Sequence, residues 1–250
     1  MSGVQTVDEA LAAAGGVDGW MSEDQMAELH RAASATVPGE RIVEIGSFRG
    51  RSTIVLAGSA PAGVEVVAID PHAGNDRGPQ EIEGFAAEAD DDHRRFLDNL
   101  AGAGVIDRVR HVRRFSDQAH GDVEGEIEVL LIDGAHRYGP ARRDIHDWGA
   151  RVAPGGTLLI HDSFSSVGVT LAIGRELVAG RRFRYVGRVR SLAVYHADLD
   201  GTLASRVANA GCQLAQLPWF AGNLALKVVL TIGLGGAVGR VTGRRPEWPY

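Results

Sequence analysis

The stretch EIGSFRGRST, residues 44–53, decides the fold class of this 250-residue chain. It follows the apolar run Arg41–Val43 and leads into an apolar segment that ends near Ala60, an order typical of a strand, a glycine-containing turn and a helix. Gly46 and Gly50 allow the backbone to turn tightly and to approach a ligand closely. The first turn of the helix presents free N–H groups that attract negative charge. We therefore predict a ligand-binding loop after the first strand of an α/β domain.

Three classes of cofactor bind at such a loop, and the spacing of the glycines separates them. A nucleoside triphosphate loop needs Gly-x-x-x-x-Gly-Lys-Ser/Thr, whereas this chain has Gly-x-x-x-Gly-Arg-Ser. A dinucleotide loop has a second glycine where this chain has Phe48, whose ring would crowd a pyrophosphate. The remaining class is a cofactor that bears an amino acid: Glu44 would hold its ammonium group, and Asp70, which ends the next strand, both hydroxyls of its ribose. The alternative is a plain strand-to-helix turn.

Apolar strands alternate with helical segments along the rest of the chain, which indicates a parallel sheet covered on both faces. Ser22 and Gln25 form a capping-box pattern that predicts a helix before the first strand. The polar stretch 71–93 predicts a solvated loop, a lid over the cofactor, or both. We expect strands over 41–46, 64–70, 109–112, 127–133 and 156–162, a closing hairpin over 183–189 and 192–196, and helices over 52–60, 140–152, 167–179 and up to about residue 100.

Two later strands also end in groups that bind metals or move protons. Asp133 ends one apolar run, with His136 three residues further on, and His161 and Asp162 end the next. Because ligands gather at the carboxyl ends of parallel strands, we expect Asp133, His161 and Asp162 to converge, where they would suit a divalent ion such as magnesium. His136 titrates in the range needed to accept a proton from a hydroxyl group. The alternatives are that the aspartates cap helices and that His136 is a surface or packing residue.

Composition narrows the partners and the location. A net charge of −6 provides no basic face for phosphate backbones, so we expect no nucleic-acid partner. Cys212 is the only cysteine and the N-terminus lacks a signal-peptide pattern, which favours the cytoplasm. The preference for arginine over lysine suggests a GC-rich bacterial genome.

The segment Leu217–Val241 is long enough to span a membrane, but it contains Asn223, Lys227 and a run of glycines (Gly233, Gly235, Gly236 and Gly239). We expect a buried arm, a subunit interface or a peripheral membrane contact instead of a span. A homodimer is expected because an apolar arm needs a surface to bury against. The sequence thus divides into an N-terminal helical segment (1–40), the main domain (41–200) and the apolar arm (201–250).

Five motifs, in this order along the chain, resemble those of metal-dependent class I O-methyltransferases. They are Glu-x-Gly-x-x-x-Gly-x-Ser-Thr from Glu44, Asp-Gly-x-His-x-Tyr from Asp133, Asp-x-x-x-Trp from Asp144, Pro-Gly-Gly from Pro154 and His-Asp-Ser from His161. The resemblance covers about residues 41–163. It points to enzymes that modify sugars, namely the macrocin and mycinamicin methyltransferases and those of methylmannose polysaccharide biosynthesis. The catechol O-methyltransferases share only the spacing of the first motif.

The resemblance implies a Rossmann-like class I methyltransferase fold, α/β, with a mostly parallel seven-stranded sheet and helices on both faces. It implies S-adenosylmethionine and a divalent cation, Mg2+ or another, as cofactors, and a small-molecule or oligosaccharide acceptor whose hydroxyl is methylated. His136 matches the catalytic base and Asp133 a second catalytic residue. At His161 the sugar enzymes typically carry an acid, and since magnesium prefers oxygen ligands, this departure predicts a weaker or a different metal. The implied cofactor contacts are Glu44, Gly46, Ser47, Ser52, Asp70, Ser116, Asp117 and Asp133, and the implied metal ligands are Asp133, His161 and Asp162.

Other functions remain open from the sequence. The same carboxylates would serve a metal-dependent hydrolase or a hydroxylase-like protein, and the fold without its chemistry would serve a binding protein; a nicotinamide oxidoreductase is more remote. A catechol or another small natural product is the alternative acceptor. Trp148 is a candidate for the core, and Trp219, Phe220 and Trp248 are candidates for the core, an interface or sugar stacking.

Overall fold

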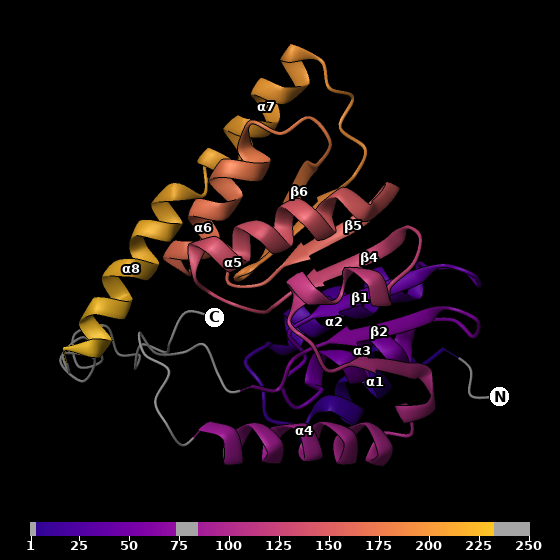
Figure 1. The fold of residues 1–250 in the computed structure, drawn as a ribbon. Helices are drawn as coiled ribbons and strands as arrows, with labels where there is room; N and C mark the ends of the chain where they lie inside the picture. The colour runs from indigo at the N-terminus through magenta and orange to yellow at the C-terminus, as the bar shows by residue number, and fades with distance from the viewer. Residues whose placement is uncertain (1–3, 74–84, 233–250) are drawn as a thin grey trace.

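The computed structural model describes residues 4–73 and 85–232, with a seven-stranded sheet at the centre (Figure 1). The spatial order of the strands is β3-β2-β1-β4-β5-β7-β6. The first five strands are parallel, and β7 is antiparallel to both β5 and β6. This architecture confirms the α/β fold with a mostly parallel sheet. The strands are β1 (Arg41–Ile45), β2 (Glu65–Ile69), β3 (Val109–Val112), β4 (Ile127–Ile132), β5 (Val152–Ile160), β6 (Arg184–Val189) and β7 (Leu192–His196).

Helices cover both faces of the sheet, and each face has its own hydrophobic core. Side chains alternate along a strand, so Ile42 of β1 packs in one core and its neighbour Val43 in the other. The first core includes side chains of the helices α1 to α4, and the second includes side chains of α5 and α6. The helices of the two layers are α1 (Val7–Ala14), α2 (Glu23–Ser34), α3 (Arg51–Ser59), α4 (Phe85–Gly102), α5 (Tyr138–Arg143) and α6 (Val167–Ile173).

Two further helices, α7 (Leu203–Leu214) and α8 (Leu217–Thr231), follow one another along an outer edge of the molecule (Figure 1). Short 3-10 turns lie at Ile106–Arg108, Ser116–Gln118, His120–Asp122 and Gly149–Arg151, and π-helical turns at Asp144–Trp148 and Gly174–Val178. Within residues 4–73 and 85–232, no helix is long and apolar enough to cross a membrane.

The N-terminal helix prediction is confirmed in detail. Ser22 caps α2: its hydroxyl accepts from the backbone N–H of Gln25, and the Gln25 side chain accepts from the backbone N–H of Ser22 at 2.9 Å. Met26 and Leu29 of this helix are fully buried in the first core. The segment before the first strand is therefore packed into the same core as the sheet.

Two predicted boundaries are wrong. The helix expected over 140–152 begins at Tyr138 and ends as a regular α-helix at Arg143, where the π-helical and 3-10 turns continue it. The strand expected from residue 156 already begins at Val152. Its pairing with β4 shifts register after Ile127, and Gly155 adopts φ +86° in the irregular stretch. Hydrophobic periodicity does not report such bulges.

Some predictions concern residues 74–84 and 233–250, which lie outside the described part of the chain. They include the middle of the polar stretch 71–93, the end of the apolar arm with its run of glycines, and Trp248.

Gly46 lies where the strand order reverses, between the carboxyl ends of β1 and β4. A Cβ at this position would lie 2.4 Å from the carbonyl oxygen of Asp133 and 2.7 Å from the Cα of Gly134. The residue also has φ +86°, a conformation that favours glycine. The N–H of Gly46 donates to Ile69 of β2, and the N–H of Asp133 donates to Ile45 of β1. Gly46 thus allows three adjacent strands to end close together.

We expect the Gly46→Ala variant to lose about 3 kcal/mol or more of unfolding free energy, because the new methyl group meets backbone atoms and the left-handed φ is strained. The matched control is Gly102→Ala, since nothing lies within 4 Å of a Cβ built there. Its expected effect is neutral or stabilising by up to about 1 kcal/mol. Urea titration followed by circular dichroism measures both, and equal stability of the two variants would contradict this account of Gly46.

Candidate functional site

A cavity of about 790 Å³ lies at the carboxyl ends of the parallel strands. Its size is in the range of sites for cofactors and small ligands. Its position is the one expected for an open α/β sheet, outside the strand ends where the strand order reverses. All the predicted site residues except Glu44 line it: Gly46, Ser47, Ser52, Asp70, Ser116, Asp117, Asp133, His136, His161 and Asp162.

Glu44 lies behind the cavity wall and is fully buried. The hydroxyls of Ser52 and Thr53, from the first turn of α3, donate to its two carboxylate oxygens. Burial raises the pKa of Glu44 to about 8, although these hydrogen bonds lower it; the charges of Asp133 and Asp70 raise it further. The carboxyl group therefore connects β1 to α3 beneath the glycine turn.

Asp70 fixes the glycine turn from the neighbouring strand. Its Oδ2 accepts from the N–H groups of Ser47 and Phe48 at 2.9 and 2.8 Å, and its Oδ1 accepts from the N–H of His72 at 2.7 Å. The Asp70 side chain still lines the cavity and is 15% exposed. A carboxylate has about four acceptor sites, so Asp70 can hold the turn and accept from a ligand hydroxyl at the same time.

Ser116 and Asp117 form the part of the cavity wall that follows β3, and two residues of the π-helical turn hold Ser116. The Ser116 hydroxyl donates to Oδ1 of Asp144 at 2.5 Å, and the Trp148 indole donates to the Ser116 carbonyl at 3.2 Å. Burial raises the pKa of Asp144 to about 6, against the effect of the Ser116 hydrogen bond. Trp148 is completely buried and is therefore a core residue.

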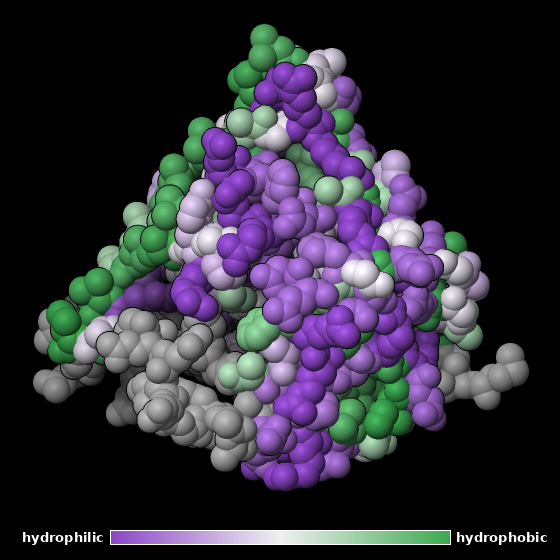
Figure 2. Space-filling model, in the orientation of Figure 1, coloured by the Kyte–Doolittle hydropathy of each residue, from purple (hydrophilic) through white to green (hydrophobic). Residues whose placement is uncertain are grey.

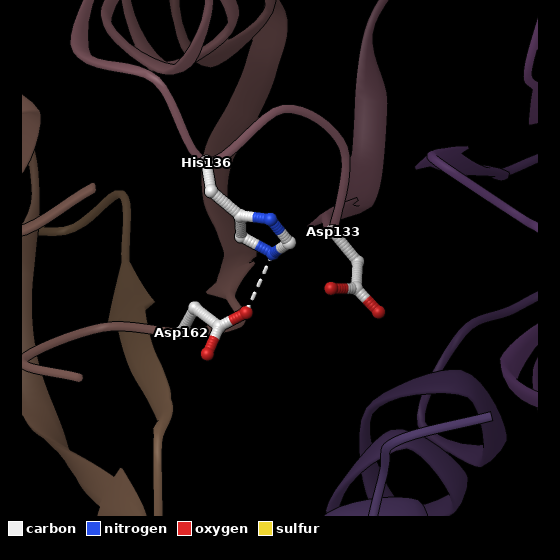
Figure 3. Close-up of side chains that lie close together, drawn as sticks. All are labelled: Asp133, His136 and Asp162. Atoms are coloured by element: carbon white, nitrogen blue, oxygen red, sulfur yellow. Dashed lines mark ion pairs between the residues drawn. The ribbon is translucent and has the colours of Figure 1, made fainter. Parts of the chain in front are cut away.

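Two aspartates and two histidines form a continuous chain of contacts at the ends of β4 and β5. Nε2 of His136 lies 2.6 Å from Oδ2 of Asp162 (Figure 3). Nδ1 of His161 lies 2.8 Å from Oδ1 of Asp133 and 3.6 Å from Oδ2 of Asp162. The His161 side chain is 1% exposed, whereas that of His136 is 35% exposed. His161 thus lies beneath the two carboxylates, and His136 lies at the cavity surface.

The charges of this cluster are strongly coupled. Burial lowers the pKa of His161, but the Asp133 and Asp162 carboxylates outweigh it and raise the pKa to about 10. Burial also lowers the pKa of His136, and its hydrogen bond with Asp162 raises the pKa above the ordinary value. Burial would raise the pKa of Asp162, yet the two histidines hold it far below its usual range. The two carboxylates thus favour the charged form of His161, and the histidines favour the charged form of Asp162.

The geometry brings three potential metal ligands together within the described residues. One ligand atom each of Asp133, His136 and Asp162 lies within 4.8 Å of the others (Figure 3). Two carboxylate oxygens and one imidazole nitrogen suit a divalent cation, and the nitrogen favours a metal softer than magnesium. Asp133 and Asp162 belong to the predicted set of metal ligands. The histidine in this group is His136, whereas the sequence predicted His161. The donor set fits a metal, and the metal ligands remain a prediction.

The turn that carries Asp162 is strained and is held by α8. Asp162 has φ +55° and Phe164 has φ +54°, conformations that L-residues rarely adopt. The Asn223 side chain donates to the Phe164 carbonyl at 3.0 Å, and the Lys227 ammonium donates to the carbonyl of Ser165 at 2.9 Å. Burial lowers the pKa of Lys227, and the charge of Asp162 opposes that effect. The C-terminal helix therefore contributes to the position of an active-site carboxylate.

Sequence reasoning missed several residues of the cavity wall. Trp20, in the turn between α1 and α2, packs against Phe48 with ring centroids 4.8 Å apart and the rings tilted by 36°, and both line the cavity. Leu224 and Lys227 of α8 line it as well. The one available signal is that Lys227, the only lysine of the chain, interrupts an apolar helix. Nothing in the sequence indicates that Trp20 reaches the cavity, because it depends on how α1 and α2 pack.

Comparison with known proteins agrees with this geometry. Residues 43–163 match a family model described as a methyltransferase domain. The O-methyltransferase NovP has a similar structure, with a TM-score of 0.54 and 16% identity over 71% of this chain and 81% of that chain. TomG from Streptomyces achromogenes, an O-methyltransferase of tomaymycin synthesis solved in complex with SAM, has a TM-score of 0.54 and 19% identity over 78% and 92% of the two chains. At these identities the structures show a shared fold.

The burial of Glu44 predicts a pH-dependent stability. The pKa is about 8 in the folded chain against an ordinary 4.5, so the proton stabilises the folded state. This contribution is complete below about pH 4.5 and is lost as pH rises towards 8, at about 1.4 kcal/mol per pH unit. We expect Glu44→Gln to melt progressively higher than the parent protein between pH 5 and pH 8. The control is Glu124→Gln, at an exposed position; a pH-independent difference for Glu44→Gln would contradict the assignment.

Proposed function

We propose that this chain, whose residues 43–163 match a methyltransferase domain model, methylates a hydroxyl oxygen of a sugar or oligosaccharide, with S-adenosylmethionine as donor and with a divalent cation assisting. A precursor of a methylmannose polysaccharide is the proposed acceptor class. The observation that carries the proposal is the cavity itself. One wall is the glycine turn with Asp70 and Ser116, and the opposite wall is the Asp133–His161–Asp162–His136 cluster.

The first wall supports the choice of donor. Backbone N–H groups at the start of α3 and the Asp70 carboxylate would bind the polar amino-acid and ribose parts of the donor. Ser116 and Asp117 would contact its adenine ring. Glu44 lies one layer further back, and it would act on the donor through Ser52, which lines the cavity and donates to it.

The second wall supports transfer to oxygen. An alcohol releases its proton poorly at neutral pH, so the reaction gains from a base close to the acceptor. His136 lies at the cavity surface and is paired with Asp162, which orients the ring and makes it a stronger base. Asp133 would accept a hydrogen bond from the acceptor hydroxyl. S-adenosylmethionine would supply the electrophilic methyl group, and a cation held by the Asp133 and Asp162 carboxylates would stabilise the developing negative charge on oxygen.

A sugar acceptor rests on the sequence resemblance and on the shape of the cavity wall. Trp20 and Phe48 form an aromatic pair that faces the cavity. Aromatic faces pack on the C–H face of a sugar ring, and the nearby carboxylates accept from its hydroxyls. The homodimer and the cytoplasmic location expected from the sequence remain predictions.

We expect purified protein to bind S-adenosylhomocysteine with micromolar affinity in calorimetric titration. Asp70→Asn should weaken this binding about tenfold, because it removes a charged acceptor and loosens the glycine turn. Asp98→Asn, on α4, is the control for a change of charge outside the cavity wall. The absence of binding by the parent protein, with and without magnesium, would reject the proposed donor.

Turnover measurements test the roles proposed for the Asp133–His161–Asp162–His136 cluster. Mannose oligosaccharides and catechol are supplied as acceptors with S-adenosylmethionine and Mg2+ or Mn2+, and release of S-adenosylhomocysteine is measured. We expect turnover with the sugars, and His136→Ala and Asp133→Asn should lower kcat by about 100-fold or more while donor affinity stays within about threefold. Full turnover by either variant contradicts the assigned role, and turnover with catechol alone contradicts the acceptor class.

A further inference from the structure

The outer face of α7 and α8 is apolar and uncovered in the described part of the chain. Large apolar side chains are exposed along both helices; those of α7, Leu203, Val207 and Leu214, are spaced by four and seven residues, which places them on one side of the helix. Figure 2 shows them as a hydrophobic band along the outer edge of the two helices. The exposed fractions are 74% for Leu203, 63% for Val207, 50% for Leu214, 45% for Leu217, 57% for Val228 and 60% for Ile232, which directly follows α8.

The polar groups of the same helices point inwards, which fixes the orientation of this face. Asn223 and Lys227 bond the carbonyls of Phe164 and Ser165. Arg206 donates to the Ala179 carbonyl at 3.2 Å. Residues 203–232 contain no aspartate or glutamate, and Arg206 and Lys227 are their only charged side chains. The outer face is therefore apolar without an acidic group.

Charge is divided unequally along the sequence. Residues 1–202 contain 31 acidic and 21 basic side chains, a net charge of −10. Residues 203–250 contain five basic side chains and one acidic side chain, a net charge of +4. Three of these basic residues, Arg240, Arg244 and Arg245, follow α8 in the sequence and lie outside the described residues. The apolar helices thus belong to the one positively charged part of an acidic protein.

We propose that the outer face of α7 and α8 binds the surface of a lipid bilayer that contains anionic head groups, with the two helices lying in the plane of the surface. An apolar helix face beside basic residues is the combination that holds proteins at such surfaces. No helix of the described residues spans a membrane, so the contact is peripheral. The acidic remainder of the protein is repelled by the same surface, which orients the molecule with this edge down.

A second copy of the chain is the competing occupant of this face. A symmetric dimer would place the same patch of each copy against the other. The net charge of +4 on residues 203–250 would oppose the pairing of two copies, whereas anionic lipids attract it. The charge distribution therefore favours the bilayer.

A bilayer contact at this face also bears on the acceptor, and this step rests on the proposed function. Leu224 and Lys227 of α8 line the cavity, while Val228 on the same helix is exposed. One helix thus separates the cavity from the proposed lipid contact. An amphiphilic acceptor, with a sugar head group and an apolar part held in the bilayer, would reach the cavity along this edge.

Flotation of the full chain with lipid vesicles tests the proposal without reference to turnover. Vesicles of phosphatidylcholine with about 30 mol% phosphatidylglycerol are compared with phosphatidylcholine alone. We expect the protein to float with the anionic vesicles, at least about tenfold more tightly than with the neutral ones, and to lose affinity as salt rises from about 0.05 M to about 0.5 M. Failure to float with anionic vesicles, or equal binding to both kinds, would overturn the proposal.

The variant Val207→Glu/Val228→Glu places two acids on the face and should reduce binding more than about tenfold. The matched control is Val37→Glu/Ile106→Glu, at positions 53% and 39% exposed, of which Ile106 precedes β3 at the opposite edge of the sheet. Circular dichroism and binding of S-adenosylhomocysteine show that each variant is folded. Unchanged flotation of the first variant, or an equal loss in the control, would place the contact elsewhere.

Sedimentation equilibrium of the lipid-free chain identifies the competing occupant. We expect a monomer, or a dimer that Val207→Glu/Val228→Glu does not dissociate. A dimer that this variant dissociates would show that a second copy covers the face and would overturn the proposal. A protein that floats but lacks donor binding would retain the membrane contact and lose the proposed function, so the two failures are distinguishable.

Discussion

The close approach of β1 and β4 at Gly46 is the constraint on which the site depends. With no Cβ at Gly46, the backbone of Asp133 comes within a distance that any other residue would prevent. Asp133 thereby lies at the same sheet edge as the glycine turn and Asp70. The N–H of Asp133 donates to the carbonyl of Ile45, which joins the end of β4 to β1. The N–H of His161 donates to the carbonyl of Ile132, which joins the end of β5 to β4. The glycine turn, Asp70, Asp133 and Asp162 therefore line one cavity at the strand ends, as the order of the strands requires.

Electrostatics then determine how so many carboxylates lie together. Glu44, Asp70, Asp133, Asp144 and Asp162 all lie near the strand ends, and three kinds of contact stabilise them. Burial raises the pKa of Glu44 to about 8, hydroxyl groups of Ser52 and Thr53 donate to its carboxyl group, and the Ser116 hydroxyl donates to Asp144. Backbone N–H groups hold Asp70. His161 lies between Asp133 and Asp162, where a buried pair of carboxylates would otherwise repel.

Most of the fold follows from the sequence because its signals are local. The apolar runs that became β1, β2 and β4 are too continuous for a solvated sheet, and Ser22 with Gln25 determines where α2 begins. The irregular helix after α5 and the early start of β5 were missed; the start of β5 depends on its pairing with β4, which no local pattern records. In the site, the strand-end rule located Asp70, Asp133 and Asp162. The rule did not predict the different positions of His136 and His161. The position of a side chain after a strand depends on the conformation of the turn that follows, and Asp162 in the turn after β5 is left-handed.

The two sides of α8 have different surroundings: one contacts the 162–166 turn, and the other is exposed. Lys227 and Asn223 in an otherwise apolar segment count against a membrane span on sequence grounds, and the structure gives their physical reason. Both side chains turn towards the strained 162–166 turn, where carbonyl groups of Phe164 and Ser165 would otherwise lack these donors. A buried carbonyl without a partner costs about 1–3 kcal/mol, so these contacts favour one orientation of α8 about its axis. That orientation leaves apolar side chains such as Val228 to face outwards. The contacts that hold the 162–166 turn therefore leave an exposed apolar face on the other side of α8.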